Sequence, residues 1–168
     1  MNRRTSILAM GGLLFVAVRA ARGAMPSVLR PRFRRATIHH TATPPDRAAE
    51  RVRAIDADHR SRGWDGCGYH LLVAESGAVF FGRPLDRQGA HVKGENEGNL
   101  GVALIGDYTD RPPPEAALAS VRRLLTWAFE TWGFGPEAVY FHKELGATEC
   151  PGNWPKELLL GAERKVKG

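Results

Sequence analysis

Two histidines and a cysteine lie at or after predicted strand ends, and their side chains could bind a metal ion. His39 ends a short β-prone run, His142 directly follows the last such run, and Cys150 comes eight residues later. Imidazole nitrogen and thiolate sulfur are preferred zinc ligands, and three of them with an open fourth position are typical of catalytic zinc. These residue types indicate a catalytic zinc site, although the 102 residues between His39 and His142 match no local zinc signature.

Other interpretations of the same residues stay open at this point. A single histidine is usually a polar residue satisfied by its neighbours, and Cys150 could be a small buried apolar side chain. In an oxidising compartment Cys150 could also pair in a disulfide with Cys67, the second cysteine of the chain. Residue type alone does not decide between these interpretations.

The elements that must position these side chains alternate between strands and helices. Apolar or β-prone runs predict strands, and apolar residues at helical spacing predict helices. The order β-α-β-β-β-α-β predicts a single α/β domain with a central mixed sheet and flanking helices. The expected strands are 36–40, 69–74, 78–82, 100–105 and 138–141, and the expected helices are 48–59, 118–132 and 154–160.

Composition and charge fit one globular domain rather than a nucleic-acid-binding protein. The 168 residues are 43% hydrophobic and 25% charged, which is enough for an ordinary core. The net charge of +6 falls to +2 when the first 24 residues, with four arginines and no acidic residue, are set aside. The other basic residues are spread along the chain, which argues against nucleic acid and suits an anionic polymer.

The first 23 residues have the three parts of a secretory signal. Arg3 and Arg4 form a basic start, Ile7 to Val18 is an uncharged run, and small residues follow from Ala20. The run is too short to span a bilayer, and the paired arginines resemble a twin-arginine signal. We expect residues 1–23 to be a signal peptide, with a retained anchor or a cytoplasmic helix as alternatives. No later stretch predicts a membrane span.

Short segments between Arg35 and Pro155 follow one another in an order that is similar to one enzyme family. The chain resembles the type 2 N-acetylmuramoyl-L-alanine amidases, which include phage lytic amidases and the animal peptidoglycan recognition proteins. The segments that carry the resemblance are Thr37–Ala42, Gly63–His70, Gly77–Arg83, Gly89–His91, Asn99–Val102, His142–Glu144 and Thr148–Gly152.

The resemblance implies an amidase domain over residues 34–162 with the fold of the peptidoglycan recognition proteins. It implies that His39, His142 and Cys150 bind Zn²⁺, which would leave Cys67 as a free, buried thiol. Tyr69 matches the active-site tyrosine of the family. Thr148 occupies a position that is lysine in some phage members and threonine in recognition-protein amidases.

The reaction implied is hydrolysis of the amide between N-acetylmuramic acid and L-alanine in peptidoglycan. The expected partners are peptidoglycan or muropeptides, met by a monomer in the periplasm or outside a bacterial cell. The polar loop 83–99 would contact glycan and stem peptide, and Asn99 is its expected substrate-binding end. His91 either lines the groove or faces water, and we favour the groove. His40 should face the opposite side of its strand from His39.

Two alternative functions compete with this one. A family member that loses a metal ligand becomes a peptidoglycan-binding module without catalysis, but all three ligand positions are filled here. A zinc peptidase with no cell-wall substrate lacks support because the sequence contains no HExxH motif.

Overall fold

A computed structural model gives the structure of residues 33–160. The predicted signal peptide, residues 1–23, lies outside the described residues, and so does the predicted end of the domain at residue 162. No helix within residues 33–160 combines the length and the apolar character needed to cross a membrane.

Five strands form one mixed sheet in the order β3-β2-β4-β1-β5. Strand β1 runs parallel to both of its neighbours, β4 and β5, whereas β3 at the edge is antiparallel to β2. Parallel strands end at the same side of a sheet, so residues that follow β1 and β5 meet there. The strands are β1 (Arg35–His40), β2 (Leu71–Val73), β3 (Val79–Phe81), β4 (Asn99–Leu104) and β5 (Val139–Phe141).

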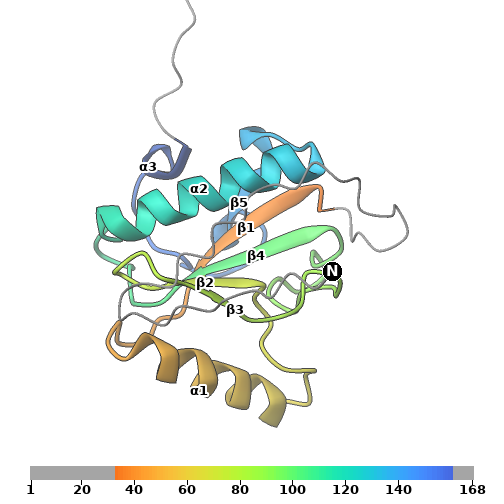
Figure 1. The fold of residues 1–168 in the computed structure, drawn as a ribbon, viewed down its shortest axis with the longest axis vertical. Coiled ribbons are helices and arrows are strands. Elements are labelled where there is room, and N and C mark those ends of the chain that lie inside the picture. Colours follow the sequence, from red (N-terminus) through yellow and green to blue (C-terminus); the bar gives the residue numbers. More distant parts are fainter. Residues whose placement is uncertain (1–32, 161–168) are drawn as a thin grey trace, which may run out of the picture.

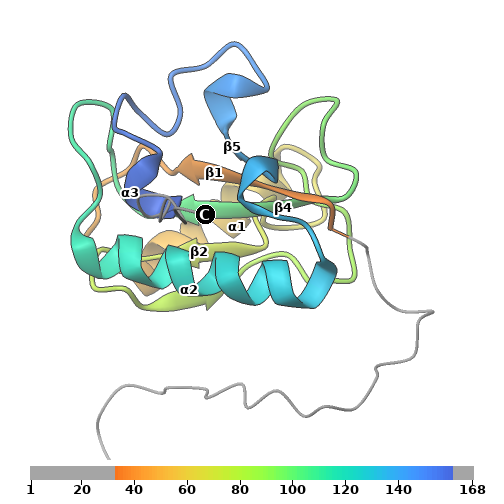
Figure 2. The same ribbon diagram turned by 90° about the horizontal axis from the view of Figure 1, so that it is seen from above.

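Helices cover both faces of the sheet (Figure 1, Figure 2). On one face lie α2 (Glu115–Trp132) and the short α3 (Glu157–Leu160); α1 (Ala48–Ser61) lies on the other. The two sides are packed differently. The α2 helix buries an apolar stripe that includes Leu118, Val121 and Leu125, whereas α1 has no fully buried residue. The α1 face is therefore the thinner cover.

Alternation along β1 sends neighbouring residues to opposite faces, as expected for His39 and His40. Ile38 joins the core beneath α2. The His40 ring also lies on that side, where its Nδ1 accepts a hydrogen bond from the backbone N–H of Tyr108 at 3.1 Å. His39, fully buried, faces the α1 side, where its ring lies 5.1 Å from that of Tyr69.

The predicted elements are all present, but their ends differ: β1, α1 and α2 are longer than predicted, and β2, β3, β5 and α3 are shorter. The hairpin pairs only 71–73 with 79–81, and its turn is closed where Gly77 adopts a φ of +83° that favours glycine. The last helix begins at Glu157 rather than at Trp154, whose indole N–H donates to the Pro151 carbonyl. Two short 3-10 helices were not predicted, η2 (Pro136–Ala138) and η3 (His142–Glu144).

The buried His70 makes stability depend on pH. Its Nδ1 accepts from the Gly101 N–H at 2.9 Å, its Nε2 bonds the Arg87 carbonyl, and burial lowers its pKa from 6.5 to about 4. The unfolded chain therefore binds a proton first, so this contribution is complete above pH 6.5 and is lost as pH falls to 4. The loss is about 1.4 kcal/mol per pH unit.

We expect the variant His70→Gln to lose less stability than the wild type between pH 6.5 and pH 4. Urea unfolding of both proteins across this range, with a chelator present, measures the difference. Equal slopes of unfolding free energy against pH would show that His70 does not carry the effect.

Candidate metal centre

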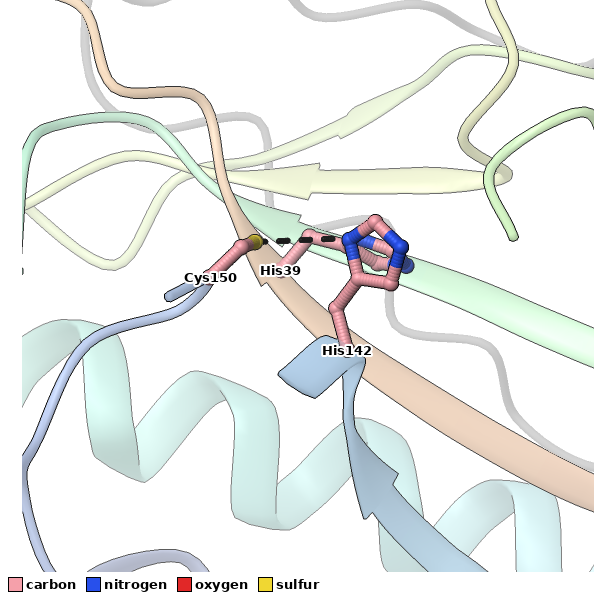
Figure 3. A group of neighbouring side chains, drawn as sticks. All are labelled: His39, His142 and Cys150. Atoms are coloured by element: carbon pink, nitrogen blue, oxygen red, sulfur yellow. Dashed lines mark hydrogen bonds between the residues drawn. The ribbon is translucent and has the colours of Figure 1, made fainter. Parts of the chain in front are cut away.

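Three side chains from distant parts of the sequence meet at the carboxyl end of β1 and β5. His39 comes from β1, His142 from η3 directly after β5, and Cys150 from the loop that follows (Figure 3). Their potential ligand atoms all lie within 4.8 Å of one another. His39 is wholly buried, and the other two are partly exposed, so the cluster has a closed floor and an open side.

The geometry of the cluster fits a tetrahedral metal ion. The Sγ atom of Cys150 lies 3.8 Å from Nδ1 of His39. Tetrahedral zinc at ordinary bond lengths separates such a sulfur and nitrogen by about 3.6 Å. Two imidazoles and a thiolate are a donor set that zinc prefers over magnesium or calcium, which take oxygen ligands. The structure therefore brings together the three residues that the sequence indicated.

Burial keeps the histidines of the cluster neutral. The pKa of His39 lies well below its usual 6.5 because of burial, reinforced by His91 and His142, and burial lowers the pKa of His142 as well. A neutral imidazole keeps the lone pair that a metal ion needs. Both rings are thus ready to act as ligands at neutral pH.

Cys150 contacts the end of β1 at His39 and His40. The backbone N–H of His40 donates to its Sγ at 3.3 Å, which favours the thiolate. Burial acts the other way and raises the pKa of the thiol to about 11. Ionisation therefore depends on a positive charge arriving nearby, as a bound cation would provide. The loop that carries Cys150 is also held by the Lys143 ammonium, which donates to the Gly152 carbonyl at 2.7 Å.

The two cysteines are both free thiols. Cys67 is buried, 3% exposed, in the small apolar cluster beneath α1 with Leu72 and Ala103. The disulfide alternative is therefore not realised, and Cys150 is left for the metal cluster.

A groove of about 550 Å³ opens above the metal cluster on the α1 side of the sheet. Because α1 packs loosely, several of its polar side chains form one wall instead of facing only water. Volumes of this size are typical of sites for small ligands and short polymers. The wall from α1 and its following turn includes Arg51, Asp58, His59, Arg62 and Trp64, and Tyr69, His91 and His142 line the opposite side.

Tyr69 lies in this groove beside His39. Burial raises the pKa of its phenol, with Cys150 and Cys67 adding to the effect, so the hydroxyl stays protonated. A protonated phenol donates a hydrogen bond but is a poor base. The structure thus puts a neutral donor next to the metal cluster.

His91 and His59 also form part of the groove. The His91 ring is 9% exposed, and its Nδ1 lies 3.0 Å from Nε2 of His39, so the water-facing alternative is wrong. His59 is only half-buried, but its Nδ1 accepts from the Gly68 N–H at 2.9 Å, and it lines the groove. No sequence pattern indicates this contact, because His59 lies within a predicted helix and the Gly68 N–H nine residues later is brought to it by the fold.

Asn99 does not lie in the groove, which corrects the expectation that its side chain binds substrate. The residue is wholly buried, its Oδ1 accepts from the Thr37 hydroxyl, and its Nδ2 donates to the Glu95 carbonyl. Both ends of the amide are used inside the protein because Asn99 begins β4 rather than ending a loop. Only its backbone carbonyl is connected to the site, as the acceptor for His91.

Thr148 and Glu149 precede Cys150 and have different surroundings. The Thr148 hydroxyl accepts a hydrogen bond from the Cys150 backbone N–H at 3.2 Å, and this side chain is not among those that line the groove. Glu149 is exposed. The contact gives Thr148 a part in shaping the Cys150 loop, and a direct catalytic contact stays a prediction.

Arg83 is a residue that the sequence did not single out. Its guanidinium donates to three backbone carbonyls, those of Cys67, Gln88 and Gly66, at 2.8, 3.0 and 3.1 Å. It thereby ties the segment before Tyr69 to the polar loop that carries His91. An arginine at the end of a strand is common on surfaces, so no local pattern signals this role.

Comparisons with known proteins agree on one family. The sequence model described as N-acetylmuramoyl-L-alanine amidase matches residues 29–153. The human N-acetylmuramoyl-L-alanine amidase is 36% identical over 131 residues, which cover 73% of this chain and 23% of that protein. The chain thus spans about a quarter of the length of this relative.

Solved structures give the same result. The N-acetylmuramoyl-L-alanine amidase LysC from Clostridium intestinale has a TM-score of 0.67 and 29% identity, over 81% of this chain and 88% of LysC. Peptidoglycan recognition protein-LE in complex with tracheal cytotoxin has a TM-score of 0.67 and 32% identity, over 74% of this chain and 76% of that one.

The metal cluster can be tested with cobalt, which replaces zinc in tetrahedral sites. We expect one Co²⁺ per chain and a thiolate-to-cobalt charge-transfer absorption, because Cys150 is the only cysteine in the cluster. Cys150→Ala should abolish this absorption, and the matched variant Cys67→Ala should keep it. If the absorption is lost in Cys67→Ala and kept in Cys150→Ala, Cys67 is the ligand and the assignment of Cys150 is wrong.

Proposed function

The chain belongs to the N-acetylmuramoyl-L-alanine amidase family, and we propose that it is a zinc-dependent enzyme that cleaves peptidoglycan between N-acetylmuramic acid and L-alanine. The observation that carries the proposal is the meeting of His39, His142 and Cys150 beside an open groove that His142 lines. Metal-dependent hydrolysis requires a complete set of ligands, whereas binding of peptidoglycan does not. The runner-up function is a peptidoglycan-binding module, since a related recognition protein is known in complex with tracheal cytotoxin.

The residues divide the chemical task between them. A zinc ion held here would polarise the scissile carbonyl and supply a bound water with a pKa near 7. The two neutral imidazoles and one thiolate leave the ion about one net positive charge, which preserves its Lewis acidity. His39, anchored in β1, fixes the position of the centre relative to the groove.

Tyr69 is proposed to stabilise the charge that develops on the carbonyl oxygen. Tyr69 lines the groove with its ring 5.1 Å from that of His39, and its neutral hydroxyl needs no deprotonation to donate. A donor fixed before the reaction costs no reorganisation during it. Thr148 is proposed to support the reaction by shaping the Cys150 loop, where its hydroxyl accepts a hydrogen bond from the Cys150 backbone N–H.

The substrate would lie along the groove between α1 and the loop that carries His91. Arg51 and Arg62 line one wall, where each is paired with an aspartate, Asp46 or Asp58, and we propose that their guanidinium groups also bind the carboxylates of a stem peptide. We propose that the protein acts as an exported monomer, in the periplasm or outside the bacterial cell, after removal of residues 1–23.

Digestion of defined muropeptides tests the reaction. We expect release of intact stem peptides with a free L-alanine amine, detected by mass spectrometry, and loss of release with a chelator or in Cys150→Ala. Cys67→Ala is the control and should keep activity. Cleavage within the peptide, or full hydrolysis by Cys150→Ala, would contradict the proposal, and binding without cleavage by the zinc-loaded wild type would favour the binding module.

Removing the Tyr69 hydroxyl should affect chemistry more than binding. We expect kcat of Tyr69→Phe to fall about 10²–10³-fold with KM nearly unchanged, as for other oxyanion donors. Steady-state kinetics with a muropeptide substrate measure both constants. A rise in KM at constant kcat would instead make Tyr69 a substrate-binding residue.

A further inference from the structure

Two buried histidines are joined in series behind the metal cluster. Nε2 of His39 lies 3.0 Å from Nδ1 of His91, and Nε2 of His91 lies 3.1 Å from the backbone carbonyl oxygen of Asn99. The last of these atoms, a carbonyl oxygen, can only accept. It therefore fixes the direction of every proton in the series.

The directions follow one from the next. Nε2 of His91 must carry the hydrogen that the Asn99 carbonyl accepts, so Nδ1 of the neutral His91 ring has a free lone pair. That lone pair accepts from Nε2–H of His39. In the neutral His39 ring the remaining nitrogen, Nδ1, is then unprotonated, and this is the atom that faces Sγ of Cys150.

The His91 ring occupies a slot that two glycines keep open. A Cβ atom on Gly101 of β4 would lie 2.6 Å from Cδ2 of His91, and one on Gly89 would lie 2.4 Å from the same atom. Any side chain at either position would push the ring away. The backbone is thus shaped to hold His91 against His39. This steric observation is independent of the hydrogen bonds.

We propose that His91 is a positioning residue for the metal centre, which holds the His39 ring in the tautomer and orientation that present Nδ1 to the ion. This rests on the proposed metal site and deepens it. His91 does not need to touch the substrate or the ion. Partners of this kind typically contribute 10–100-fold to metal affinity, because a ligand that must change tautomer or rotate binds more weakly.

The wild-type protein gives the first test, which needs no variant. Long-range ¹H–¹⁵N correlation spectra report which ring nitrogen of each histidine carries a proton. In the metal-free protein at neutral pH we expect His39 and His91 both as Nε2–H tautomers, and His39 should keep its Nε2–H when zinc is added. A His91 ring protonated on Nδ1 would overturn the proposal.

Zinc affinity of variants gives the second test, measured by competition with a chromophoric chelator. We expect His91→Phe, which keeps a ring but no hydrogen bond, to weaken zinc binding 10–100-fold. His91→Gln should recover most of the loss, because its amide can accept from His39 and donate to Asn99. Gly101→Ala should resemble His91→Phe, because its Cβ displaces the ring.

His70→Gln is the matched control, because His70 is an equally buried histidine that bonds backbone groups but no proposed ligand. It should lower stability and leave zinc affinity unchanged. Wild-type zinc affinity in folded His91→Phe would overturn the proposal. If the variants show the expected zinc affinities but the wild type cuts no muropeptide, the role of His91 stands and the proposed enzymatic function is wrong.

Discussion

The parallel pairing of β1 with both β4 and β5 is the constraint on which the site depends. It places the ends of three strands at one side of the sheet, although the residues come from positions 40, 104 and 141. His39 then needs no loop to hold it, because the strand that carries it is fixed by hydrogen bonds on both sides. His142 follows β5 at once, so its place is set by the register Ile38↔Phe141. Only Cys150 reaches the cluster through a loop.

Much of this could be predicted because the signals were local. Alternation along β1 separated His39 from His40, and two neighbouring apolar runs predicted β2 and β3. The segment from Thr148 to Gly152 identified Cys150 through resemblance, since its separation of 111 positions from His39 carries no geometric information. These predictions depend on short-range rules of backbone and periodicity, which hold wherever the strands pair.

The misplaced residues depend on contacts that only the folded chain creates. Asn99 was assigned to a polar loop, yet it begins β4, and its amide is consumed by Thr37 and Glu95. Arg83 donates to the carbonyls of two separate segments, at Cys67 and at Gln88, and no sequence pattern marks such carbonyls. His91 could be placed near the groove but not against His39, because its partner lies 52 positions away.

The thin cover that α1 makes has a consequence for how this protein can change. None of its residues is fully buried, yet it supplies much of one groove wall, so the surface that lines the groove is separate from the core that holds the sheet. Substitutions at Arg51, Asp58 or Arg62 alter groove charge without opening a cavity or moving β1. Ligand preference can therefore diverge among descendants, or in a selection experiment, while the machinery beneath stays constant. The residues of the α1 wall and the residues of the metal cluster thus belong to separate elements of the fold.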